Sequence, residues 1–303
     1  MKIKNEYLYA AISILMWSTT ATITKLLLGN LTTTQIMLVG YFFAFIFLLI
    51  VNLIKGNLKE LKEFKATDYL QIGAIGSLGT FFYHKFLYIG MDILDASQAL
   101  IINELWPIMI VIFSCIILKE QLTVKKVFAI VLSFAGVIIV ASDKSILSMG
   151  AESAKGVICC ILAAVSYGLF SVLCKLKTYN RLLSTMIFYF VSTVISLLYV
   201  ALFEGSFELS AIQTWGLMWS GVFTNAIAFT TWTLALEKGD TAKVSNLCYL
   251  VPVISLVWTS LILKEELKIT TLVGLVVIIA GILIQIKKDS PKIKNIKQTE
   301  VKI

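Results

Sequence analysis

One stretch of this chain occurs twice, 145 positions apart. Residues 96–141 align with residues 241–286 without a gap, and the matched residues include Pro107 and Pro252, Leu118-Lys119-Glu120 and Leu263-Lys264-Glu265, and Gly136 and Gly281. An odd number of predicted membrane spans separates the starts of the two copies, so the copies enter the bilayer from opposite sides. Inverted repeats of this kind are typical of transporters that work by alternating access.

The composition indicates a protein that lies mostly in lipid. Hydrophobic residues make up 58% of the chain and charged residues 15%, and the mean hydropathy is +0.90. Ten apolar stretches have about the 20 residues that a helix needs to cross a bilayer. They cover residues 8–28, 34–54, 69–90, 96–118, 124–141, 155–176, 183–203, 214–236, 242–263 and 268–286. We therefore predict an all-α polytopic membrane protein with ten transmembrane helices, built as two inverted five-helix repeats over 1–146 and 147–288 and followed by a basic tail over 289–303.

Basic residues are distributed unevenly between the two sides of this arrangement. If the N-terminus lies in the cytoplasm, 20 of the 26 basic residues fall in cytoplasmic segments and only Lys144, Lys155, Lys264 and Lys268 fall in outside loops. Because loops rich in Lys and Arg stay in the cytoplasm, both termini are predicted to be cytoplasmic and the protein to lie in the cell membrane. The net charge of +8 is thus explained by topology rather than by binding to nucleic acid.

Motifs of enzymes and ATP-driven pumps are missing from the sequence. It has no Walker loop, no HExxH and no GxSxG, and its five cysteines form no CxxC or Cys/His spacing. We therefore expect a protein that is not an enzyme, has no catalytic residues and needs no cofactor or metal. If transport is driven, the energy comes from a gradient, and coupling to protons is left open.

Two of the three prolines are repeat partners near the middle of predicted spans. Pro107 and Pro252 each remove one backbone hydrogen bond and free the carbonyl four residues earlier, on Asn103 and Cys248. Unpaired backbone groups at that depth are tolerated only against protein or a wet cavity. Both kinks are therefore predicted to line a central substrate cavity, with a simple packing kink as the alternative.

Polar and aromatic side chains cluster around these kinks and along the helices expected to face them. We predict a substrate site for a small amphipathic organic solute, formed by Trp17, Tyr83, His84, Asn103, Glu104, Trp106, Tyr167, Trp232, Asn246 and Tyr249. The alternative is that these groups only make hydrogen bonds between helices.

Glu104 is the most unusual of these residues. A carboxylate near the bilayer centre costs roughly 2.5 to 3.5 kcal/mol on insertion scales, so it usually has a role. Measured along the helices, His84 and Lys85 lie at a similar depth. The sequence leaves open whether Glu104 pairs with Lys85, pairs with His84, binds a cationic substrate group or carries a proton.

Taken together, these residues resemble the drug/metabolite transporter superfamily, in particular its ten-span EamA-type members built from two five-span halves. The resemblance covers essentially the whole chain and rests on Trp17-Ser18, the doubled Leu-Lys-Glu-x-Leu motif and the Ala-Gly that follows each copy. The stretch Asn103-Glu104-Leu105-Trp106-Pro107 is also similar to the Asn-Tyr-Leu-Trp-Pro of the aromatic amino acid exporters within the superfamily, with Glu104 in place of Tyr. The resemblance implies export of an amino acid or related metabolite.

Two other functions remain as alternatives at this point. A multidrug or organic-cation exporter could use Glu104 as its proton-coupled carboxylate, although the first and sixth spans have no acidic residue of the kind the small multidrug proteins use. A structural or sensory membrane protein without flux is the second alternative. The substrate, the direction of transport and the choice between monomer and homodimer are not fixed by the sequence.

Overall fold

The computed structural model describes residues 5–119, 121–143, 150–176, 179–238, 247 and 250–286, and within these ranges the chain is helical, without a strand. Helix is present in every one of the ten predicted apolar ranges, although in 242–263 the described helix begins at Leu250. The α-helices are α1 (Asn5–Ser18), α2 (Thr20–Leu28), α3 (Thr33–Lys55), α4 (Ala66–Ser77), α5 (Tyr83–Ile93), α6 (Ala96–Asn103), α7 (Trp106–Ile117), α8 (Val124–Ala141), α10 (Ala151–Leu173), α11 (Arg181–Tyr199), α12 (Ala211–Met218), α13 (Ala228–Lys238), α15 (Leu250–Ile262) and α16 (Ile269–Ile286).

The length and composition of the helices are those of a membrane protein. Five helical stretches of the described chain are long and apolar enough to cross a bilayer. They cover Asn5–Leu28, Thr33–Lys55, Ala96–Ile117, Ala151–Leu173 and Arg181–Glu204. Large apolar side chains such as Ile54 and Leu70 are exposed on the outside of the bundle, as expected for surfaces that meet lipid rather than water.

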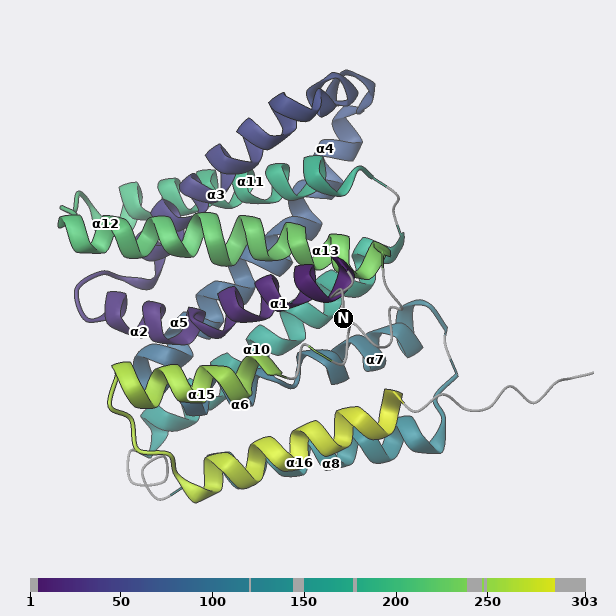
Figure 1. Ribbon diagram of the computed structural model, residues 1–303, viewed down its shortest axis with the longest axis vertical. Helices are drawn as coiled ribbons and strands as arrows, with labels where there is room; N and C mark the ends of the chain where they lie inside the picture. The colour runs from purple at the N-terminus through teal and green to yellow at the C-terminus, as the bar shows by residue number, and fades with distance from the viewer. Residues whose placement is uncertain are drawn as a thin grey trace, which may run out of the picture.

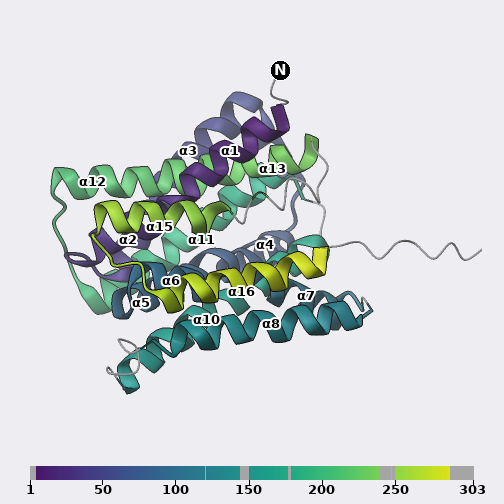
Figure 2. The ribbon, with the colours of Figure 1, turned by 60° about the horizontal axis from the view of Figure 1, so that its bottom comes forward.

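The packing of the helices brings distant parts of the sequence together. Helix α8 lies beside α16 along one edge of the bundle, and α3 packs against α11 (Figures 1 and 2). Helix α10 packs against both α5 and α7, whereas α1 packs against α13 and α15. Every one of these contacts joins a helix of residues 5–141 to a helix of residues 151–286.

Glycines allow the closest of these approaches. A Cβ added to Gly136 would lie 2.6 Å from Ile278, and one added to Gly281 would lie 2.6 Å from the Ser133 hydroxyl oxygen. A Cβ at Gly274 would lie 2.3 Å from Val140. The glycine face of α16 therefore packs against α8 within the chain.

Two helical stretches contain π-helical segments near their centres. These are η2 (Leu78–Phe82), between α4 and α5, and η5 (Trp219–Ile227), between α12 and α13. A π-turn is wider than an α-turn and leaves carbonyls available for side chains of other helices. Tyr41 on α3 donates to the Thr80 carbonyl of η2 at 3.0 Å, and Tyr189 on α11 donates to the Asn225 carbonyl of η5 at 3.4 Å.

The lysine in each copy of the doubled motif has a positive φ. Lys119 and Lys264 follow α7 and α15, and they are the non-glycine residues with positive φ among the described residues, at 55° and 57°. A left-handed residue at this place is a common way to end a helix, although it favours glycine over lysine. The lysines of the two copies thus share a left-handed φ.

Candidate functional site

The candidate site is centred on a break between α6 and α7. Helix α6 ends at Asn103, α7 starts at Trp106, and Glu104 and Leu105 form the turn between them. Pro107 is the second residue of α7, where a proline is tolerated because the first amides of a helix have no partner within it. The predicted kink is therefore present, as a short break directly before the proline. Asn103 is 2% and Glu104 6% exposed, so two polar side chains are buried at the break.

Asn103 has unused hydrogen-bonding capacity. Its Nδ2 donates to the Tyr83 hydroxyl at 3.2 Å. Its buried Oδ1 has no partner within the described residues. A buried acceptor without a partner costs free energy. A hydrogen bond from a further N–H or O–H donor to this oxygen would therefore be favourable.

Aromatic rings surround the break. The Tyr83 ring centroid lies 4.9 Å from that of Tyr167 on α10, and the Trp106 ring lies 5.4 Å from Tyr167. Glu104 directly follows Asn103 in the chain, and its side chain interacts with that of Trp106. The structure thus brings together five of the ten residues of the predicted site. These five are Tyr83, Asn103, Glu104, Trp106 and Tyr167, and we call them the α6–α7 cluster.

His84 is bound to neighbouring helices. Its Nδ1 lies 3.0 Å from the Tyr41 hydroxyl and 3.0 Å from the Thr80 carbonyl oxygen, and its ring lies 4.7 Å from that of Tyr83. The residue therefore touches the α6–α7 cluster through Tyr83, while its Nδ1 holds α5 to α3.

Lys85 does not pair with Glu104. Its Nζ donates to Thr33 Oγ1 at 2.9 Å and to Thr34 Oγ1, and it lies over the ring of Tyr199 at 4.7 Å. The lysine is therefore directed towards α3 and α11. Of the roles left open for Glu104 by the sequence, neutralisation of Lys85 is not the one seen here.

Two of the predicted site residues form a separate pair. The rings of Trp17 on α1 and Trp232 on α13 lie 5.4 Å apart, and Trp17 Nε1 donates to the Thr224 carbonyl of η5 at 3.0 Å. Pro252 is buried as the third residue of α15. Asn246 and Tyr249 lie outside the described residues.

Sequence reasoning missed two buried tyrosines beside the cluster. Tyr41 and Tyr189 are 1% and 5% exposed, and their rings lie 5.6 Å apart. Each is the ninth residue of its helix, α3 and α11 respectively. This matched position of two tyrosines in corresponding predicted spans was the available signal.

Comparison with protein families gives a match over most of the chain. The model of the EamA-like transporter family matches twice, over residues 4–142 and over residues 154–286. A solved crystal structure superposes with a TM-score of 0.68 at 21% sequence identity, covering 92% of this chain and 96% of the other, which shows a shared fold.

Individual relatives are named as transporters. An uncharacterized transporter of Archaeoglobus fulgidus is 25% identical over 75% of this chain and 81% of its own length. The uncharacterized transporter YvbV of Bacillus subtilis is 31% identical over 67% of this chain and 68% of its own. The aromatic amino acid exporter YddG of Ancylobacter novellus is 26% identical over 58% of this chain and 62% of its own. With a family model that matches both parts of the chain, the protein belongs to the EamA-like transporter family.

Proposed function

We propose that the protein transports a small amphipathic organic metabolite with an amino group, such as an amino acid, out of the cell. The observation that carries this proposal is the α6–α7 cluster, where the buried Glu104 carboxyl and Asn103 Oδ1 lie beside three aromatic rings, and that oxygen has no partner in the described part of the chain. Two adjacent acceptors suit the N–H groups of an ammonium, and the rings suit an apolar or aromatic remainder. The similarity to an aromatic amino acid exporter supports the same class.

The mechanism that we propose is alternating access of two inverted halves, residues 1–146 and 147–288, with ten membrane spans. Three observations support it. The family model matches once in each half, the doubled Leu-Lys-Glu motif has the same positive φ in both copies, and Tyr41 and Tyr189 bind carbonyls of corresponding π-helical segments. In such transporters the substrate lies where helices break near the bilayer centre, and the α6–α7 cluster surrounds a helix break of this kind.

For the membrane we propose the cell membrane, with both termini in the cytoplasm. This rests on the uneven distribution of Lys and Arg between the loops. In a cysteine-free variant, a single cysteine at Lys62 should react with a membrane-impermeant maleimide only in opened cells. A single cysteine at Glu208 should react in intact cells. Labelling of the Lys62 site from outside would contradict the orientation.

An exporter of drugs or other organic cations is the second candidate, because the same Glu104 carboxyl could pair with a cation or exchange a proton. Counterflow in proteoliposomes separates the candidates, with labelled aromatic amino acids, nucleosides and an organic cation offered to the same preparation. Accumulation of an amino acid supports the first candidate, and accumulation of only the organic cation supports the second. A protein that is folded and accumulates none of them would point to a role without flux.

A further inference from the structure

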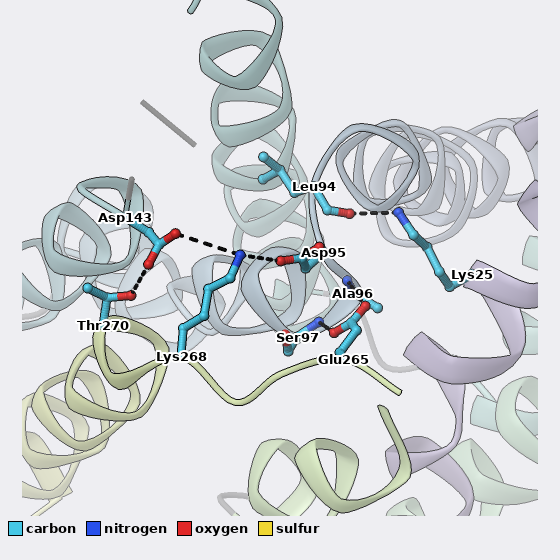
Figure 3. A network of polar contacts seen from close by, with 9 residues as sticks. All are labelled: Lys25, Leu94, Asp95, Ala96, Ser97, Asp143, Glu265, Lys268 and Thr270. Carbon is cyan, nitrogen blue, oxygen red and sulfur yellow. Dashed lines mark hydrogen bonds and ion pairs between the residues drawn. The ribbon is translucent and has the colours of Figure 1, made fainter. Parts of the chain in front are cut away.

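A polar network joins four parts of the chain at the end of the bundle where α6 begins. Figure 3 shows its side chains converging from α2, from the turn between α5 and α6, from the residues that follow α8, and from the segment between α15 and α16 with the first turn of α16. The groups that meet there are Lys25, the Leu94 carbonyl, Asp95, the amides of Ala96 and Ser97, Asp143, Glu265, Lys268 and Thr270.

Glu265 supplies the N-terminal cap of α6. Its two carboxylate oxygens accept from the backbone amides of Ala96 at 2.8 Å and Ser97 at 3.1 Å. These amides are among the four that a helix cannot satisfy itself, and a negative charge at this end also complements the helix dipole. The cap thus comes from a residue 169 positions away from Ala96.

The helix has a capping residue of its own, but that residue is engaged elsewhere. Asp95 occupies the N-cap position of α6 and makes no side-chain cap hydrogen bond. Its carboxylate instead accepts from Lys268 Nζ at 2.6 Å, and Lys268 also lies 3.6 Å from Asp143. Asp143 in turn accepts from Thr270 Oγ1 at 2.6 Å. Lys268 therefore ties the start of α6 and the end of α8 to the segment before α16.

We propose that Glu265 and Lys268 form a latch, which holds this end of the bundle closed and which must release during each transport cycle. The proposal rests on the proposed alternating access. All eight residues of α6 are buried, and the helix contacts α2, α5, α8, α10, α15 and α16. Movement of α6 away from α15 and α16 would uncover the path to Asn103 and Glu104 at its other end. The latch links α6 to the other proposed half.

Release of the latch need not leave the amides of α6 without a partner. Aspartate is among the residues that cap helices best, through an acceptor contact with the second or third amide of the helix. When Lys268 moves away, the Asp95 carboxylate is free to accept from Ser97 or Gln98. The two acceptors therefore alternate: Glu265 caps α6 in the closed arrangement, and Asp95 caps it in the open one. Because α6 is capped in both, the two arrangements can be close in free energy.

The test compares Glu265→Ala with Glu266→Ala. Glu266 is the adjacent, exposed carboxylate with no contact in the described network, so it is a matched control. Each substitution is placed in a cysteine-free chain carrying Ala99→Cys as a reporter, since Ala99 lies on α6 and is fully buried. The proteins are reconstituted in lipid nanodiscs, where both faces are accessible, so the result does not depend on orientation.

We expect maleimide to modify the Ala99→Cys reporter about fivefold faster in Glu265→Ala than in the parent, as expected for the loss of a helix cap. Glu266→Ala should react at the parent's rate, and Lys268→Met should also react faster. Hydrogen exchange of the peptide containing Ala96 and Ser97 is measured on the same samples. If Glu265→Ala speeds hydrogen exchange but leaves the maleimide rate of the reporter at the parent's value, Glu265 is only a structural cap. If hydrogen exchange is unchanged in Glu265→Ala, Glu265 does not cap α6. Either result overturns the latch.

Glu265→Gln serves as a second variant if Glu265→Ala does not fold. It keeps the size of the side chain but has one acceptor oxygen instead of two, so it should give a smaller acceleration in the same direction. The assay contains no substrate. A failed counterflow experiment would therefore reject the proposed function while leaving these rates unaffected, and unchanged rates with successful counterflow would reject only the latch.

Discussion

The amide nitrogen of Asn103 donates to the hydroxyl of Tyr83, while its amide oxygen has no hydrogen-bond partner among the residues that the structure describes. This arrangement fixes the orientation of the side chain, because the amide nitrogen is held by α5 and the oxygen must then point elsewhere. A site that is oriented before the substrate arrives loses less entropy on binding. The pair therefore combines a structural contact and a candidate binding contact in one side chain.

The first prediction separates these two contacts. Asn103→Leu should weaken substrate binding by on the order of tenfold, since it removes an acceptor for a charged donor. Tyr83→Phe removes only the structural partner and leaves the Asn103 oxygen in place, so it should weaken binding less. Binding is measured by scintillation proximity with the substrate that counterflow identifies. Equal effects of the two substitutions would mean that the Asn103 oxygen does not contact the substrate.

The second prediction concerns Glu104. If this carboxyl binds an ammonium or carries a proton, Glu104→Gln should lower flux and flatten its dependence on pH, because glutamine cannot titrate. The measurement is flux against pH at equal membrane abundance. Since Lys85 binds Thr33 and Thr34, adding Lys85→Met should not restore flux. Restoration by the double substitution would show that the two residues do pair in another state of the protein.

The third prediction addresses the break before Pro107. Pro107→Ala restores an amide that can bond to the Asn103 carbonyl, and so favours a continuous helix from α6 into α7. Flux should fall while abundance stays near that of the parent. Pro252→Ala should behave in the same way if the α15 proline has the corresponding role. Transport at the parent's rate by both variants would reduce the prolines to packing residues.

The sequence predicted which residues gather at the break, but not how they are rotated. Tyr83, Asn103 and Tyr167 were placed together because polar and aromatic side chains within a membrane turn away from lipid. The direction of the Lys85 side chain was not predicted, because position along a helix fixes only one coordinate and rotation about the helix axis depends on packing. The π-helical turn at Leu78–Phe82 lies directly before Tyr83 and Lys85, and it shifts the 3.6-residue pattern on which facing residues are assigned.

Long-range partners were the other feature that sequence could not supply. The Leu-Lys-Glu motif was recognised as a repeat, yet nothing in it indicated that Glu265 would cap α6. Backbone amides carry no sequence signal, so a carboxylate that binds them has no visible partner. The matched tyrosines Tyr41 and Tyr189 were missed for the same reason, since their acceptors are carbonyls of π-helical segments.

The fourth prediction concerns pH and Lys268, which precedes α16. Burial lowers the pKa of Lys268, but its hydrogen bond to Asp95 and the charges of Asp95 and Asp143 outweigh burial and raise that pKa above 10.5. Because the pKa of Lys268 is higher in the folded protein than in the unfolded chain, the contribution of this ion pair to the free energy of unfolding is fully present below pH 10.5. It is lost as the pH rises through the pKa of Lys268 in the folded protein. The difference in unfolding temperature between the parent and Lys268→Met should thus be constant between about pH 7 and 10 and shrink above that range.

Lys264→Met is the control for that experiment, since Lys264 is an exposed lysine of the same segment. It should change the unfolding temperature little at any pH in the range. A difference between parent and Lys268→Met that already disappears near neutral pH would contradict the ion pair with Asp95.

The last prediction compares two glycines on opposite sides of one helix contact, that between α3 and η5. A Cβ at Gly221 would lie 2.2 Å from the Gly40 carbonyl oxygen and 2.7 Å from Phe43 Cβ. The obstacle is largely backbone, which cannot move aside as the end of a flexible side chain can. A Cβ at Gly40 would meet nothing closer than the Ser220 hydroxyl oxygen at 3.9 Å.

Gly221→Ala should therefore destabilise the protein by about 1 to 3 kcal/mol through overpacking. Gly40→Ala should be neutral or stabilising by up to about 1 kcal/mol, because alanine favours helix over glycine. Thermal unfolding in detergent micelles measures both. Because η5 also provides the carbonyls that bind Trp17 and Tyr189, Gly221→Ala should reduce flux as well, whereas Gly40→Ala should leave it near the parent's value. Equal stability of the two variants would mean that α3 and η5 do not approach as closely as described.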